Sequence, residues 1–162
     1  MAVEAVLLDF YGTVVHEDDV VIAAITDEIE SASTMPCTSQ DIGAFWWREF
    51  SHTCSRSHLA SFRTQREIEL ESLQATCTRF RADCDASALS ERLYHYWQQP
   101  PIYVDAVQFL ALLDLPVIVL SNIDRADIEH AIAFHDLSFD DVITSEDMRS
   151  YKPHPELFEA GR

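Results

Sequence analysis

The fold is decided near the N-terminus by the stretch VEAVLLDFYGT, residues 3–13, in which a short apolar run ends at Asp9. An apolar run of this length before a turn is typical of a strand buried on both faces of a parallel sheet. We therefore predict a strand over Val3–Leu8 and a tight loop over residues 10–13. Ligands bind outside the carboxyl ends of parallel strands, so Asp9 is the first candidate functional residue.

A similar pattern returns only after Pro100 and Pro101. Five further elements are predicted there: a helix over Val104–Leu115, a buried strand over Pro116–Leu120, a helix over Asp124–His135, a strand over Val142–Thr144 and a helix that begins in Pro155–Glu159. Alternation of strands and helices predicts an α/β fold with a parallel sheet and crossover helices.

The intervening residues 16–100 follow helical periods instead. Four apolar faces recur at helical spacing: Val21, Ile25, Ile29 and Ala32; Ile42, Phe45, Trp46 and Phe50; Leu70, Leu73, Cys77 and Phe80; Leu89, Leu93, Tyr96 and Trp97. Thr64 and Glu67 have the spacing of a capping box before the third of these helices. We predict a helical cap domain over residues 16–100, inserted into a core domain formed by residues 1–15 and 101–162, with Leu70, Leu73, Cys77 and Phe80 buried inside it.

The composition excludes several classes of function. The 162 residues carry 11 Lys and Arg against 28 Asp and Glu, a net charge of −17, which repels nucleic acid and anionic membrane surfaces. The three glycines are too far apart for a dinucleotide-binding or Walker A loop. Four cysteines without a CxxC pair, in a chain with no secretory signal, predict reduced thiols in a cytoplasmic protein. The partner that we expect is a small-molecule substrate, not nucleic acid or a membrane.

Three polar groups are predicted to meet at one edge of the sheet. Asp9 ends the first strand, Ser121 and Asn122 end the second, and Lys152, the only lysine in the chain, follows the third. A carboxylate, a hydroxyl and an ammonium group would then face one crevice. Each has an ordinary alternative: Ser121 and Asn122 could cap the next helix, and Lys152 could be a solvated surface lysine.

These segments resemble the haloacid dehalogenase superfamily of hydrolases. Residues 9–13 (DFYGT) resemble the family's first motif, residues 117–122 (VIVLSN) the second and residues 151–158 (YKPHPELF) the third, in the family's order. The helical insert lies where many members carry a cap. The resemblance implies a Rossmann-like, three-layer parallel-sheet core with an inserted helical cap, and an enzyme that hydrolyses its substrate through an aspartyl ester.

The resemblance also implies a role for each catalytic candidate. Asp9 would be the nucleophile, which suits a carboxylate because it is already ionised near neutral pH. Lys152 would hold Asp9 and the developing negative charge, Thr13 and Ser121 would orient oxygen atoms, and Asn122 would donate from its amide.

One substitution in the first motif indicates a branch of the family. Phosphatases of the family have a second Asp two residues after the nucleophile, where this chain has Tyr11. Tyr at this position resembles the 2-haloacid dehalogenases, which need no cofactor and bind the substrate carboxylate with an Arg of the cap. Trp47-Arg48 resembles that site, so Tyr11 and Arg48 are predicted to bind substrate. A surface ion pair of Arg48 with Glu49 or Glu67 is the alternative.

Two other functions remain open at this stage. The chain could be a small-molecule phosphatase of the same superfamily, with Asp9 as a ligand of Mg²⁺. It could also be a catalytically silent binding module, since the acidic fourth motif of the family does not occur after Lys152. We expect the chain to be a fragment of a longer protein, with an incomplete core and a first strand whose open edge favours a homo-oligomer.

Overall fold

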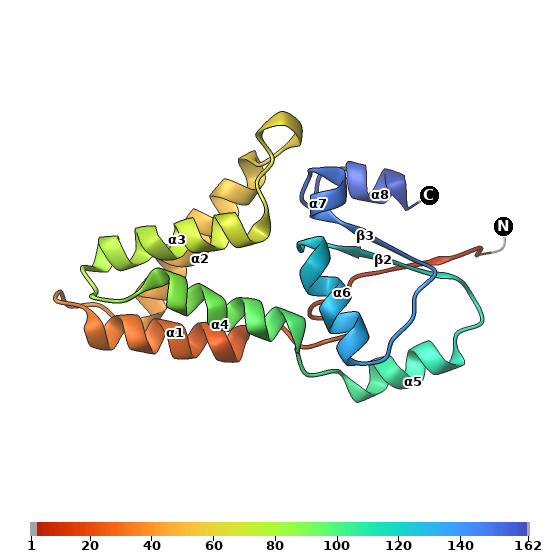
Figure 1. Ribbon diagram of the computed structural model, residues 1–162, viewed down its shortest axis with the longest axis horizontal. Coiled ribbons are helices and arrows are strands. Elements are labelled where there is room, and N and C mark those ends of the chain that lie inside the picture. The colour runs from red at the N-terminus through yellow and green to blue at the C-terminus, as the bar shows by residue number, and fades with distance from the viewer. Residues whose placement is uncertain (1–2, 162) are drawn as a thin grey trace.

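The computed structural model describes residues 3–161, whose strands form one parallel sheet (Figure 1). The strands are β1 (Val6–Leu8), β2 (Val117–Ser121) and β3 (Asp141–Thr144), in the order β1-β2-β3. Val6 lies opposite Val117, and Ile118 lies opposite Asp141. The predicted α/β fold is confirmed, but β1 is shorter than Val3–Leu8, because β2 begins at Val117 and offers no strand partner to residues 3–5.

Helices cover both faces of the sheet. Beside β2, α5 (Val104–Leu112) and α6 (Arg125–Phe134) join one apolar cluster in which Val119 and Ile128 are fully buried. On the other face, α7 (Ser145–Met148) and α8 (Glu156–Ala160) follow β3, and a side chain at Gly161 would touch Leu120. Figure 1 shows α5 and α8 on opposite sides of the strands, as a three-layer α/β core requires.

Residues between β1 and α5 form a separate group of helices, here called the helical insert. Its members are α1 (Asp19–Ala32), α2 (Ser39–Arg56), the 3₁₀ turn η1 (Leu59–Ser61), α3 (Gln65–Phe80) and α4 (Ala86–Gln98). Thr64 and Glu67 form the predicted capping box at the start of α3. Within residues 16–100, all of which the structure describes, the β contacts are isolated bridges, such as the one between Ser33 and Ala82.

The buried face of α3 differs from the predicted one. Leu73, Cys77 and Phe80 are buried as expected, but Leu70 is only half-buried, and the buried face includes Glu69 instead. The reason is that α3 packs against both α2 and α4, so the residues that face these two neighbours include polar ones. Apolar spacing alone did not predict this polar part of the interface.

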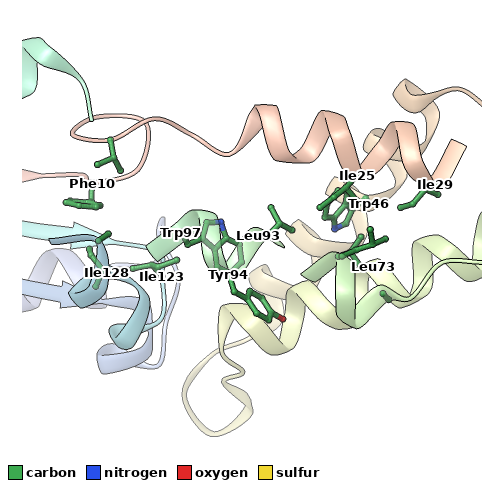
Figure 2. Packing of buried hydrophobic residues seen from close by; sticks show 14 of the residues in the cluster. Phe10, Ile25, Ile29, Trp46, Leu73, Leu93, Tyr94, Trp97, Ile123 and Ile128 are labelled. Atoms are coloured by element: carbon green, nitrogen blue, oxygen red, sulfur yellow. The ribbon is translucent and has the colours of Figure 1, made fainter. Parts of the chain in front are cut away.

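One continuous apolar cluster joins the helical insert to the sheet. Figure 2 shows Phe10 and Ile128 at the sheet end, Trp97 and Leu93 in the middle, and Trp46 within the insert. In the part of the chain that the structure describes, we find no helix that is both long and apolar enough to cross a membrane.

Two carboxylates of the core dock the helical insert. The carboxylate of Asp124 accepts hydrogen bonds from the backbone N–H groups of Gln65 (2.7 Å) and Arg66 (3.0 Å) at the start of α3. Arg66 also forms an ion pair with Asp127. Its Nε donates to Asp127 Oδ2 at 2.8 Å, and its Nη2 binds the other carboxylate oxygen. Gln98 Nε2 of α4 donates to the same carboxylate at 2.9 Å.

The first prediction concerns Asp127, whose side chain is 0% exposed. Asp127→Ala leaves the Arg66 guanidinium and the Gln98 amide without their shared acceptor, so we expect the free energy of unfolding to fall by about 3 kcal/mol. Urea unfolding followed by circular dichroism measures the change. The control Glu129→Ala removes an exposed carboxylate of the same helix and should cost less than about 0.5 kcal/mol. Equal losses in both variants would contradict the docking role of Asp127.

Candidate active site

The predicted pair of charged residues meets at the carboxyl end of the sheet. Lys152 Nζ lies 2.8 Å from Oδ1 of Asp9, whose side chain is 48% exposed. The same Oδ1 accepts a hydrogen bond of 2.9 Å from the backbone N–H of Phe10. The predicted ion-pair distance between Asp9 and Lys152 is therefore confirmed. Among the described residues, Oδ2 of Asp9 has no protein hydrogen-bond partner, so this oxygen is available to a ligand.

Lys152 is fixed at its backbone and at its ammonium group by Asn122, which follows β2, and by Leu120 within β2. Its Nζ donates to the carbonyl oxygen of Leu120 at 2.9 Å. Its backbone N–H donates to Asn122 Oδ1 at 2.7 Å, and Asn122 Nδ2 donates to the carbonyl oxygen of Lys152 at 3.2 Å. Asn122 therefore donates from its amide, as expected, and the group that receives this hydrogen bond is the backbone of Lys152.

The loop after β1 needs a glycine. Gly12 has φ +78°, a conformation that side chains disfavour, and an added Cβ would lie 2.5 Å from a carboxylate oxygen of Glu17. The turn closes with Gly12 N–H donating to the carbonyl oxygen of Val15 at 2.8 Å. Thr13 is exposed in this loop, and Ser121 is buried at the end of β2.

A cavity of about 840 Å³ lies between the helical insert and these loops, within the size range of small-molecule sites. Its core side contributes Tyr11, Asn122 and Lys152. Its apolar wall comes from the insert and consists of Ile22, Trp46, Trp47, Phe50, Leu93 and Trp97. Lys152 lies on the cavity wall, so the Asp9–Lys152 pair borders a largely aromatic cavity.

The two buried tryptophans of the cavity each donate a hydrogen bond to an acidic side chain. Trp97 Nε1 donates to Asp18 Oδ2 at 2.8 Å, and Trp46 Nε1 donates to Glu69 Oε1 at 2.9 Å. Burial raises the pKa of Asp18, and burial raises the pKa of Glu69 to about 8. Burial of Glu69, which is 5% exposed, therefore favours its neutral form. The sequence analysis missed Glu69, although a Glu on the buried face of an amphipathic helix could have signalled it.

Tyr11 lies on the cavity wall as predicted. Its hydroxyl donates to the carbonyl oxygen of Trp97 at 2.6 Å, which links the first loop to the end of α4. Burial, with the nearby charges of Asp127 and Asp18, raises the pKa of Tyr11 above its usual value. The phenol therefore stays protonated and does not act as a base near neutral pH.

Arg48 does not reach the cavity. Its side chain is 64% exposed, its Nη2 lies 3.5 Å from Glu49 Oε1, and its guanidinium group lies 4.8 Å from the ring centre of Phe45. The neighbouring Trp47 lies on the cavity wall instead, because consecutive residues of a helix point in directions about 100° apart. The prediction that Arg48 faces the cleft is wrong for this structure, and the alternative ion pair with Glu49 is the one observed.

The residues around Asp9 do not fit Mg²⁺. This ion prefers several oxygen ligands in octahedral geometry. Here the ammonium group of Lys152 binds Oδ1 of Asp9, and the next polar position of the motif is a phenol whose hydroxyl is already bonded. Among the described residues, the one group of three potential metal ligands is His58, His154 and Glu156, which does not include Asp9.

The parallel α/β sheet, the strand-end Asp–Lys pair and the helical insert agree with the class of hydrolase that the sequence motifs resemble. A family model described as haloacid dehalogenase-like hydrolase matches residues 3–162. The chain belongs to this family, which confirms the resemblance of its three motifs.

Several relatives are dehalogenases. The chain is 24% identical to haloacetate dehalogenase H-2 of Moraxella sp. (strain B), over 98% of this chain and 70% of the relative. It is 24% identical to (S)-2-haloacid dehalogenase of Pseudomonas fluorescens, over 96% of this chain and 68% of the relative.

Among solved structures, L-2-haloacid dehalogenase from Xanthobacter autotrophicus superposes with a TM-score of 0.72 at 25% identity. The match covers 99% of this chain but 64% of that protein. A second structure of that protein has chloropropionic acid covalently bound. Our chain thus spans about two thirds of the length of these relatives.

The second prediction concerns the buried carboxyl of Glu69. Because its pKa rises from 4.5 to about 8 on folding, the folded protein keeps a proton that the unfolded chain releases between these pH values. Stability is therefore expected to fall as pH rises from about 5 to 8, by up to about 4 kcal/mol. In Glu69→Gln the loss should be much smaller. Urea unfolding at pH 5 and pH 8 compares the two proteins, with the exposed Glu91→Gln as control. A parallel fall in wild type and Glu69→Gln would refute the assignment.

Proposed function

We propose that this chain carries the nucleophile and the adjacent cation of a hydrolase that displaces halide from 2-haloacids. The observation that carries the proposal is the 2.8 Å contact of Asp9 with Lys152 at the edge of an apolar cavity, in a chain of the haloacid dehalogenase-like family. The names of the relatives and the covalently bound chloropropionic acid in one of them support the same chemistry.

The first step is a displacement at carbon. Oδ2 of Asp9 forms a bond to C2 of the substrate, the C2–halogen bond breaks, and the halide leaves with the electron pair. Halide is a weak base and leaves without a proton, so this step needs no general acid. This agrees with Tyr11, whose raised pKa keeps it neutral, at the position where the phosphatases of the family have their second Asp. Oδ1 stays bound to Lys152 and to the N–H of Phe10 and so fixes the direction of attack.

The second step hydrolyses the ester. Water adds to Cγ of Asp9, and the negative charge that develops on Oδ1 meets the Lys152 ammonium group and the Phe10 N–H, two donors already in place. The Cγ–Oδ2 bond then breaks, and Oδ2 takes one proton of the added water and leaves as the hydroxyl group of the product. The second proton of that water is released to solvent when the Asp9 carboxyl ionises again. The balance is one 2-haloacid and one water giving one 2-hydroxyacid, one halide and one proton.

The remaining residues of the proposed site bind or orient. Asn122 positions Lys152, and Thr13 and Ser121 are proposed to orient oxygen atoms near Asp9. Tyr11 and the apolar wall would contact the substrate side chain, which favours haloacids with an apolar group at C2. Arg48 has no role in this proposal because it lies outside the cavity. The proposed reaction uses no cofactor, and the magnesium-dependent phosphatase reaction has no support from the residues around Asp9.

The third prediction tests the nucleophile. In the full-length protein, Asp9→Asn should lower the rate of halide release from 2-chloropropionate by about 1,000-fold or more, because the neutral amide is a poor nucleophile. The matched control Asp105→Asn, an exposed carboxylate at the start of α5, should keep wild-type activity. The thermal transition of Asp9→Asn should remain cooperative. Retention of more than a tenth of the activity would refute the role of Asp9.

The fourth prediction separates carbon from phosphorus chemistry. In a single turnover in ¹⁸O-labelled water, the labelled oxygen should enter the carboxylate of Asp9 and raise the mass of the protein by about 2 Da. The product hydroxyl then carries unlabelled oxygen from Asp9. Hydrolysis of an aspartyl phosphate at phosphorus would instead label the released phosphate. Mass spectrometry measures the mass of the peptide that contains Asp9 after the turnover. An unlabelled Asp9 after turnover of a haloacid would contradict the ester mechanism.

A further inference from the structure

A second cluster of ligand-type side chains lies where the helical insert meets the core. His58 follows α2 in the insert, whereas His154 and Glu156 come from the loop and helix after Lys152. One ligand atom from each of the three lies within 4.8 Å of the others. His58 Nε2 is 2.8 Å from Glu156 Oε1, and the rings of His58 and His154 stack with their centres 4.9 Å apart.

We propose that these three side chains form a binding site for a divalent transition-metal ion of the zinc type. Two imidazoles and one carboxylate are a common three-ligand set for zinc, and they disfavour the harder ions Mg²⁺ and Ca²⁺. Bonds of about 2.0–2.1 Å in tetrahedral geometry put ligand atoms about 3.3 Å apart. The His58–Glu156 pair has to open slightly from 2.8 Å, and the ligand atom of His154, which lies within 4.8 Å of the other two, has to move closer to them.

Groups behind the ligands hold them in place. Ser150 Oγ donates to Glu156 Oε2 at 2.8 Å, so one carboxylate oxygen is fixed while the other faces His58. Such outer contacts orient metal ligands. The backbone at His58 is paired with Ser150 in an isolated bridge, and Leu59 N–H donates to the carbonyl oxygen of Arg149 at 2.8 Å. Two segments far apart in sequence are thus already aligned without the ion.

The surroundings give an ion access. The side chains of His58 and Glu156 are 34% and 27% exposed, so a metal ion can reach them and keep a water molecule as its fourth ligand. His154 also lies on the wall of the cavity, two residues after Lys152. A bound ion would therefore tie the end of α2 to the segment that carries Lys152. This site is separate from Asp9 and does not depend on the proposed dehalogenation.

The test is metal binding to the chelator-treated protein. Competition with a chromophoric chelator should show one Zn²⁺ per chain, and saturating Zn²⁺ should raise Tm by about 5 °C. Co²⁺ at the same site should give the visible bands of a tetrahedral ion without the near-ultraviolet bands of thiolate ligation. Near-ultraviolet bands of thiolate ligation would show that the free cysteines, which include Cys77 and Cys84, bind the ion, and this result would overturn the proposal.

Two variants decide which residues bind the ion. His154→Gln keeps the hydrogen bond between His58 and Glu156, so its Tm without metal should match wild type, while its affinity for Zn²⁺ should fall about 100-fold. His52→Gln removes an exposed histidine of α2 outside the cluster and should bind like wild type. Undetectable binding by the wild-type protein at millimolar Zn²⁺, or equal affinity in His154→Gln, would show that the cluster is only an ion pair with a stacked neighbour.

Discussion

The arrangement of this molecule depends on the docking of the N-terminus of α3 onto the carboxylate of Asp124. A helix N-terminus has unpaired N–H groups and a partial positive charge, and Asp124 satisfies two of these groups from the core. Burial raises the pKa of Asp124, while the two N–H donors oppose that effect and favour its charged form. Arg66 extends the contact to Asp127, so both partners of the interface carry complementary charge.

This docking creates the cavity, because it holds the insert over the carboxyl ends of the strands. Once α3 is fixed, α4 brings the carbonyl oxygen of Trp97 to the hydroxyl of Tyr11 and the Trp97 indole to Asp18. The apolar wall then faces Lys152, whose ammonium group donates on the other side to the carbonyl oxygen of Leu120 in β2. Lys152 is mostly buried beside this compartment, with 18% of its side chain exposed, whereas the Asp9 side chain is 48% exposed.

Local patterns predicted a large part of the fold and of the site. The apolar run before Asp9 predicted a strand, and the strand-end rule brought Asp9 and Lys152 to the same edge, where they form an ion pair. These inferences succeed because a strand can be recognised from local sequence, and parallel strands all end at the same edge of the sheet. The residues at those strand ends therefore lie close together. Helical periods predicted the insert for the same reason. Leu70 and Arg48 were placed wrongly because helix rotation depends on the partners that a helix packs against.

The sequence by itself determined the class of fold, the family and the identity of the strand-end residues, since each rests on short motifs and on the order of elements. Only the tertiary structure decided what surrounds them. The raised pKa of Glu69 follows from its burial, which the hydrogen bond from Trp46 opposes, and the meeting of His58 with Glu156 follows from the docking of the insert on the core. Both depend on contacts between residues far apart in the chain. The helical period can place Glu69 on the buried face of α3, but it does not specify which residues pack against it.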